Sequence, residues 1–175
     1  SFPRRLGAST ARTLRALTGV VLACALAWPT LAAAEPVRTP RVEAERIAER
    51  TALVPGEPLT VALRLKMIPG WHVYWLNPGD SGLPTTIAWA LPGGITAGPI
   101  QWPAPHALPA GPLINYGYEG EVLHLVDLQV PPALAPGGTQ TLKAQVDWLV
   151  CKETCIPESV DLALTLPVAA AAGAD

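Results

Sequence analysis

The stretch "TLKAQVDWLVCKETCIPESVDLALTL", Thr141 to Leu166, holds two runs of alternating apolar residues joined by a short segment with two cysteines. The apolar positions are Leu142, Ala144, Val146, Trp148 and Val150 in the first run, and Val160, Leu162, Leu164 and Leu166 in the second. Side chains of a strand point alternately to its two faces, so this period predicts strands with one buried face. We therefore expect two neighbouring strands, the second beginning just after Pro157, with Cys151 and Cys155 in the tight connection between them.

The same alternation recurs along the chain. It is clear in Leu59–Met67 and in residues 122–130, and a shorter candidate covers Thr85–Leu91. The segment "RVEAERIAER", Arg41 to Arg50, has a helix-like composition but also alternates, and we interpret it as a strand. Proline- and glycine-rich turn signals such as "VPGEP", "NPGDSG" and "APGG" separate the runs. Seven or more short strands at this spacing, without helical stretches, predict an all-β antiparallel sandwich.

The first 34 residues have the pattern of an export signal. Four arginines precede an apolar run from Ala16 to Trp28, and "AAA" at Ala32–Ala34 fits a cleavage site. Two alternatives stay open, namely a short N-terminal membrane anchor and a lipoprotein-type cleavage at Cys24. We therefore divide the chain into a signal peptide (1–34), one domain (35–168), and a linker or tail (169–175).

Export has two consequences for function. The exported part keeps eight basic and fourteen acidic residues, a net charge of −6, because the signal holds four arginines and no acidic residue. Such a surface has no basic patch to neutralise phosphates, which argues against nucleic acid as a partner. The chain also lacks the glycine motifs of dinucleotide and P-loop sites, and we expect no cofactor. Outside the cytoplasm, two cysteines can pair.

The cysteine pair admits three interpretations. A disulfide requires "KET" to fold back as a turn, and so small a ring adds little loop entropy to stability. Because about 140 residues can bury a sizeable core without a staple, this favours a redox-active disulfide. Lys152 favours a thiolate and Glu153 opposes it. A structural link and a Cu(I) site remain open, although no histidine has ligand spacing to the pair.

Two aromatic segments stand apart from the strands. In "GWHVYWLNPGDSGLP" (70–84) we expect Trp71 and Trp75 to lie in the core ahead of a shaped loop, and a docking surface is the alternative. In "LINYGYEGEVLHL" (113–125), Tyr116 and Tyr118 either lie over the disulfide from a hairpin tip or pack as ordinary hairpin residues. Because His124 lies on an apolar strand face, we expect it to be a buried structural histidine.

Taken in order, "GWHVYWLNPGDSGLP", "NYGYEGEV" and "WLVCKETCIP" resemble the N-terminal periplasmic domain of the DsbD-type thiol:disulfide interchange proteins. The resemblance covers about Arg41 to Val168 and is nearest to the ScsB-like branch, which is linked with copper tolerance. It implies an immunoglobulin-like sandwich with one redox-active disulfide. In two respects the chain departs from the best-known members: its cysteine spacer is shorter, and only Glu119 loosely matches their acidic residues.

The resemblance also implies roles. Cys155 would form mixed disulfides and Cys151 would resolve them, with Tyr116 or Tyr118 as the aromatic cap. A thioredoxin-like domain would donate electrons in the periplasm. The acceptors would be exported disulfide isomerases or thioredoxin-like proteins. The membrane segment that feeds the donor would lie beyond Asp175 or in a separate protein.

Overall fold

The computed structural model describes residues 32–170, and all of its regular elements in this range are strands. One sheet contains β1 (Ala32–Ala33), β2 (Val37–Arg38), β3 (Val42–Ala48), β4 (Leu59–Met67), β7 (Thr96–Ala97) and β10 (Glu121–Gln129). The other contains β5 (His72–Gly79), β6 (Thr86–Ala90), β8 (His106–Ala110), β9 (Leu113–Glu119), β11 (Thr139–Cys151) and β12 (Cys155–Pro167).

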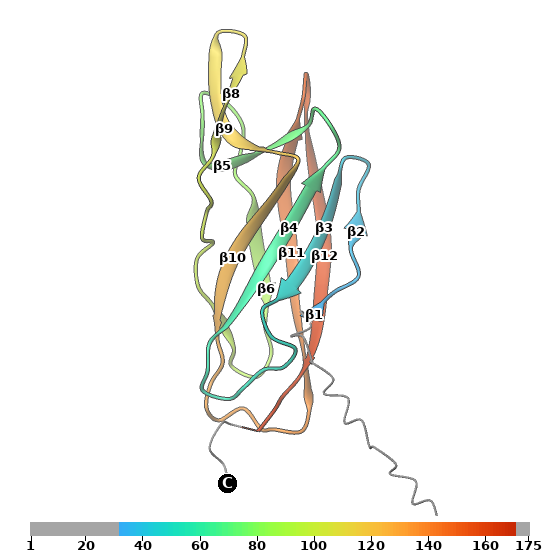
Figure 1. Ribbon diagram of the computed structural model, residues 1–175, viewed down its shortest axis with the longest axis vertical. Helices are drawn as coiled ribbons and strands as arrows, with labels where there is room; N and C mark the ends of the chain where they lie inside the picture. The colour runs from blue at the N-terminus through green and yellow to red at the C-terminus, as the bar shows by residue number, and fades with distance from the viewer. Residues whose placement is uncertain (1–31, 171–175) are drawn as a thin grey trace, which may run out of the picture.

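The two antiparallel sheets pack face to face as an immunoglobulin-like β-sandwich (Figure 1). Within 32–170, no helix is long and apolar enough to span a membrane. The signal-peptide prediction falls almost wholly on residues outside the described range, as does most of the predicted tail.

The strands predicted from alternation are confirmed. β3 lies in the ambiguous segment Arg41–Arg50, and β4 has the predicted bounds. The prediction for the last strand was wrong at its start, because β12 begins at Cys155 and includes Pro157. A proline lacks the N–H of a ladder residue and is tolerated on edge strands. β12 is such a strand, since it pairs only with β11 in its sheet.

The core lies between the sheets and is built from the alternate residues that the sequence marked as apolar. One cluster near the cysteine end contains Leu65, Val146 and Trp148, and a second contains Leu59, Leu128 and Leu166. Trp148 is buried as predicted, while Trp71 and Trp75 are partly buried and pack against the first cluster. The side chains of β11 pack in both clusters, which fixes the position of this strand, and β11 carries Cys151 at its end.

His124 on β10 is fully buried, as its place on an apolar face predicted. Its ring packs edge-on against Trp102 and Tyr118, with centroid distances of 4.7 and 5.6 Å. Neither ring nitrogen has a hydrogen-bond partner among residues 32–170, and burial lowers the pKa of His124 to about 4. The neutral ring is therefore part of the apolar core.

We expect His124 to destabilise the fold in acid. Its pKa is about 6.5 in the unfolded chain and about 4 in the fold, so the unfolded state binds more protons between these values. The stability contribution is complete above pH 6.5 and falls as the pH drops towards 4, by on the order of 3 kcal/mol. Urea unfolding at pH 7 and pH 4 measures this loss. His124→Leu should remove most of it and the exposed-site control His106→Leu should not, whereas an unchanged acid loss in His124→Leu would contradict the assignment.

The β11–β12 hairpin, which carries the cysteines, ends at one pole of the sandwich. The β8–β9 hairpin and the loop between β4 and β5 reach the same pole, and β12 ends at the opposite pole (Figure 1). Loops gathered at one end of a sandwich are the usual place for a site, because the sheets hold them in position. The cysteine pole is therefore the candidate location of a functional site.

Candidate functional site

Cys151 and Cys155 form a disulfide that closes the β11–β12 hairpin. Thirteen residue pairs join the two strands, the last being Cys151 with Cys155, whose Cα atoms are 4.1 Å apart. Lys152, Glu153 and Thr154 form the exposed turn, in which the Lys152 N–H donates to the Thr154 carbonyl. The two sulfur-bearing residues differ sharply in access, since Cys151 is 2% exposed and Cys155 is an exposed residue.

His72 and Glu119 lie beside the disulfide in the sheet. His72 on β5 pairs with Cys151 on one side and with Glu119 of β9 on the other. Burial lowers the pKa of His72, and the nearby Glu119 carboxylate partly opposes this shift. Cys151, His72 and Glu119 thus lie in one row across the neighbouring strands β11, β5 and β9, with His72 in the middle.

Tyr74 is the aromatic residue that contacts the disulfide. It is 1% exposed, and its hydroxyl lies 3.4 Å from Sγ of Cys155 and 3.3 Å from Nε2 of His72. A disulfide sulfur carries no hydrogen, so in the contact with Cys155 the phenol is the donor. Burial raises the pKa of Tyr74, which keeps that donor protonated over the physiological pH range.

The "NPGDSG" loop holds Tyr74 in place. The buried side-chain oxygen of Asn115 accepts hydrogen bonds from the Ser81 N–H and hydroxyl, at 2.9 and 3.1 Å. Asp80 accepts a 2.8 Å hydrogen bond from the Ile114 N–H. These bonds fasten the loop to β9, and Gly82 then lies directly on the Tyr74 ring, where a Cβ would be 2.4 Å from the ring carbons. A glycine at Gly82 is required both by this approach and by its φ of +99°.

The two tyrosines predicted as caps lie elsewhere on β9. Tyr118 is buried beside His124 and donates a 2.8 Å hydrogen bond to the Pro103 carbonyl, and its own burial raises its pKa to about 12. Tyr116 is 39% exposed, next to the loop glycine Gly79. Both therefore lie within a strand and not at a hairpin tip. Lys152 extends from the turn to Gly70 at the end of the β4–β5 loop.

Sequence reasoning did not select His72, Tyr74 or Asn115 for the site. His72 and Tyr74 alternate with the core residue Val73, so they share the face opposite to the core. That alternation was readable in the sequence. The pairing of His72 with Cys151, which places this face next to the disulfide, could not be read from the sequence, because β5 and β11 are distant in the chain.

A disulfide with one exposed cysteine can undergo thiol–disulfide exchange, and here the exposed cysteine is Cys155. When the disulfide opens, a thiolate on Cys155 finds the Tyr74 hydroxyl in place as a charge-assisted donor. The phenol has a single proton, which it donates to the sulfur. In its contact with His72 the phenol oxygen is therefore the acceptor, and Nε2–H of His72 is the donor. Within residues 32–170, no group of three or more His, Cys, Asp or Glu side chains is placed to hold a metal ion.

We expect Tyr74→Phe to raise the pKa of the Cys155 thiol by about one unit, because a hydrogen bond to a charged group is worth roughly 1.5–3 kcal/mol. Thiolate absorbance against pH, recorded in a Cys151→Ala background, measures the shift. Tyr118→Phe is the matched control, since it removes another buried phenol that bonds only to Pro103. Equal thiol pKa values in all three proteins would show that Tyr74 does not stabilise the thiolate.

Comparisons with known proteins bear on the fold and the family of this chain. A structure of the N-terminal periplasmic domain of ScsB from Proteus mirabilis aligns with a TM-score of 0.58 at 20% identity, over 77% of this chain and 51% of that one. This chain thus spans about half the length of that relative. A yeast GGA1 GAE domain aligns at 13% identity over 74% and 96% of the two chains, with a TM-score of 0.39.

The reduced N-terminal domain of DsbD from Neisseria meningitidis aligns at 14% identity over 71% and 83% of the two chains, with a TM-score of 0.36. No curated protein matches the sequence. The decisive match is that of residues 40–167 to the family model described as "Thiol:disulfide interchange protein DsbD, N-terminal". Since this match covers most of the chain, the protein belongs to the family of DsbD N-terminal domains.

Proposed function

We propose that residues 35–168 form a periplasmic thiol–disulfide exchange domain in which Cys155 exchanges and Cys151 resolves. A thiolate of the electron donor attacks Sγ of Cys155, the Cys151–Cys155 bond breaks, and Cys151 leaves as a thiolate that takes up a proton. The second donor thiol then attacks the mixed disulfide and releases the reduced pair. Two electrons and two protons have then entered the domain, and the donor is left as a disulfide.

The second half of the cycle passes these electrons on. The Cys155 thiolate attacks a disulfide of the acceptor, and the Cys151 thiolate resolves the resulting mixed disulfide. We infer a thioredoxin-like domain as the donor, and exported disulfide isomerases or thioredoxin-like proteins as acceptors. The family match supports this relay. We also propose that Glu119 affects the reactivity of the disulfide through His72. The Glu119 carboxylate raises the pKa of His72 and so opposes the effect of burial.

The observation that carries the proposal is the unequal exposure of the two cysteine residues. A partner thiolate can reach the exposed Cys155, while Cys151, at 2% exposure, is shielded from a partner thiolate and remains next to Cys155 to resolve the mixed disulfide. A purely structural link needs no such asymmetry. Likewise, a link that closes only a three-residue turn constrains the unfolded chain weakly.

The reduction potential of the pair tests the function. We expect equilibrium with glutathione or dithiothreitol buffers to give a value above about −300 mV, because structural disulfides typically lie below this limit. Mass spectrometry of alkylated samples measures the reduced fraction at each ratio. A potential well below −300 mV would favour the inert link and contradict exchange.

A further inference from the structure

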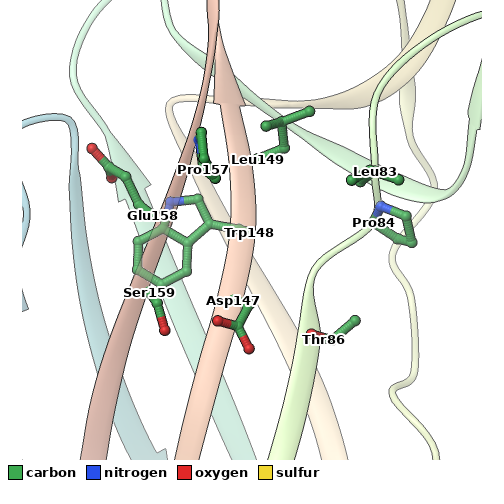
Figure 2. A pocket seen from close by; sticks show the side chains of 9 residues that line it. All are labelled: Leu83, Pro84, Thr86, Asp147, Trp148, Leu149, Pro157, Glu158 and Ser159. Carbon is green, nitrogen blue, oxygen red and sulfur yellow. The ribbon is translucent and has the colours of Figure 1, made fainter.

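A groove opens on the outer face of the second sheet, next to the disulfide hairpin. Its volume is about 370 Å³. Leu83 and Pro84 border it on one side, and Leu149 and Pro157 border it on the other, with Asp147 nearer the middle of the sheet (Figure 2). Leu83 is 64% exposed. The groove is thus an accessible apolar surface two residues along β11 from Cys151.

The groove lies at a break in strand pairing. β6 pairs with β11 from Lys143 to Asp147, and β5 pairs with β11 at Cys151. On this side of β11, residues 148–150 have no paired residue in either described ladder. An extended segment could therefore occupy the break as a short additional strand, which is a common mode of peptide recognition.

The backbone of Leu149 points into this break. Leu149 lies opposite Pro157 in the β11–β12 ladder, and a proline cannot donate the hydrogen bond of a hydrogen-bonded pair. Bonded and non-bonded pairs alternate in an antiparallel ladder, so the N–H and C=O of Leu149 face away from β12. The Cys151–Cys155 pair, two residues on, has the short Cα spacing of 4.1 Å that is typical of a non-bonded pair, which agrees with this phase.

The lining also limits the chemistry of the occupant. The charged side chains that border the groove are Asp147 and Glu158, and no basic residue of the described part of the chain lines it. Glu158 is paired with Arg41, whereas Asp147 has no ion pair within residues 32–170. An apolar segment without carboxylates therefore fits, and a segment with an acidic side chain would meet an uncompensated like charge.

We propose that this groove binds, in extended conformation, the segment that flanks the reactive cysteine of the exchange partner. An apolar side chain two positions from that cysteine lies between Leu83 and Leu149, because residues two apart in a strand share a face, as Leu149 and Cys151 do. The partner's main chain bonds to the N–H and C=O of Leu149. This inference rests on the proposed exchange at Cys155 and adds to it a basis for partner selection.

Activated peptides test the groove. The reduced Cys151→Ala protein is mixed with the blocked peptide Leu-Ala-Cys-Ala-Leu, whose cysteine carries 5-thio-2-nitrobenzoate, and the rate of dye release is compared with that of the peptide containing Asp in place of both leucines. We expect the leucine peptide to react about tenfold faster or more. N-methylation of its leucines should remove most of this advantage. Leu83→Gln, which removes the apolar contact without adding charge, should remove most of this advantage as well, and Leu123→Gln, on the other sheet, should leave it unchanged.

The small disulfide 5,5′-dithiobis(2-nitrobenzoate) separates failure of the groove from failure of exchange. Its rate should be the same in the Cys151→Ala protein with and without the neutral substitution Leu83→Gln, because it has no segment to bind. Equal rates for the two peptides beside normal reaction with the small disulfide would overturn the groove and leave exchange intact. No reaction of Cys155 with either reagent would overturn the proposed function and the groove together.

Discussion

Cys151→Ala is expected to trap a mixed disulfide through Cys155, whereas Cys155→Ala is expected to trap almost none. The reason is solvent access. A partner's sulfur can reach the exposed Cys155, whereas Cys151 is only 2% exposed. Once Cys151 is removed, nothing remains in the domain to resolve the bond. We expect at least a tenfold difference in trapped product between the two variants.

The trap is measured with a thioredoxin whose second active-site cysteine has been replaced by serine, presented as its activated mixed disulfide. Non-reducing electrophoresis and intact mass give the yield. Labelling of both variants in denaturant controls for thiol integrity, since each should then show one reactive cysteine. Equal or greater trapping by Cys155→Ala would reverse the roles assigned to the two sulfurs.

Gly117→Ala is expected to destabilise the domain by about 3 kcal/mol, near the upper end of the usual cost of overpacking. Gly117 pairs with Tyr74, and a Cβ on it would lie 2.1 Å from the Val73 carbonyl oxygen and 3.1 Å from Cα of Tyr74. Both neighbours are backbone atoms of β5, so relief requires β5 and β9 to separate. That movement would also shift the Tyr74 hydroxyl away from Cys155.

Gly138→Ala is the matched control, because an added Cβ there has no neighbour within 4 Å and the residue needs no positive φ. It should change the free energy of unfolding by no more than about 0.5 kcal/mol. Urea unfolding at neutral pH measures both variants. If Gly117→Ala proved as stable as Gly138→Ala, the close approach of β5 to β9 beneath the site would be wrong.

Both predictions concern the same chain of contacts. Asn115 and Asp80 fasten the "NPGDSG" loop to β9, the loop places Gly82 on the Tyr74 ring, and the ring presents its hydroxyl to Cys155. Gly117 allows β5 to lie close enough to β9 for this arrangement. The motif that looked like a turn behind core tryptophans therefore positions the Tyr74 hydroxyl at Sγ of Cys155.

The alternation of apolar residues determined the sandwich and the burial of most core positions. Successive side chains of a strand point to opposite faces, so the sequence of each strand by itself shows which residues face the core and which face solvent. The hairpin that brings Cys151 to Cys155 was also predictable, since both flanking strands and the turn are local. Even here Pro157 misled the prediction, because its tolerance depends on β12 being an edge strand.

Only the tertiary structure decided which aromatic residue meets the disulfide and where a partner segment can lie. Tyr74, Tyr116 and Tyr118 all lie in the two aromatic segments, and the choice among them depends on pairing between β5, β9 and β11. Such long-range registers leave no periodic trace in the sequence. The break in pairing at Leu149 has the same origin, because it exists only where β6 ends and β5 begins beside β11.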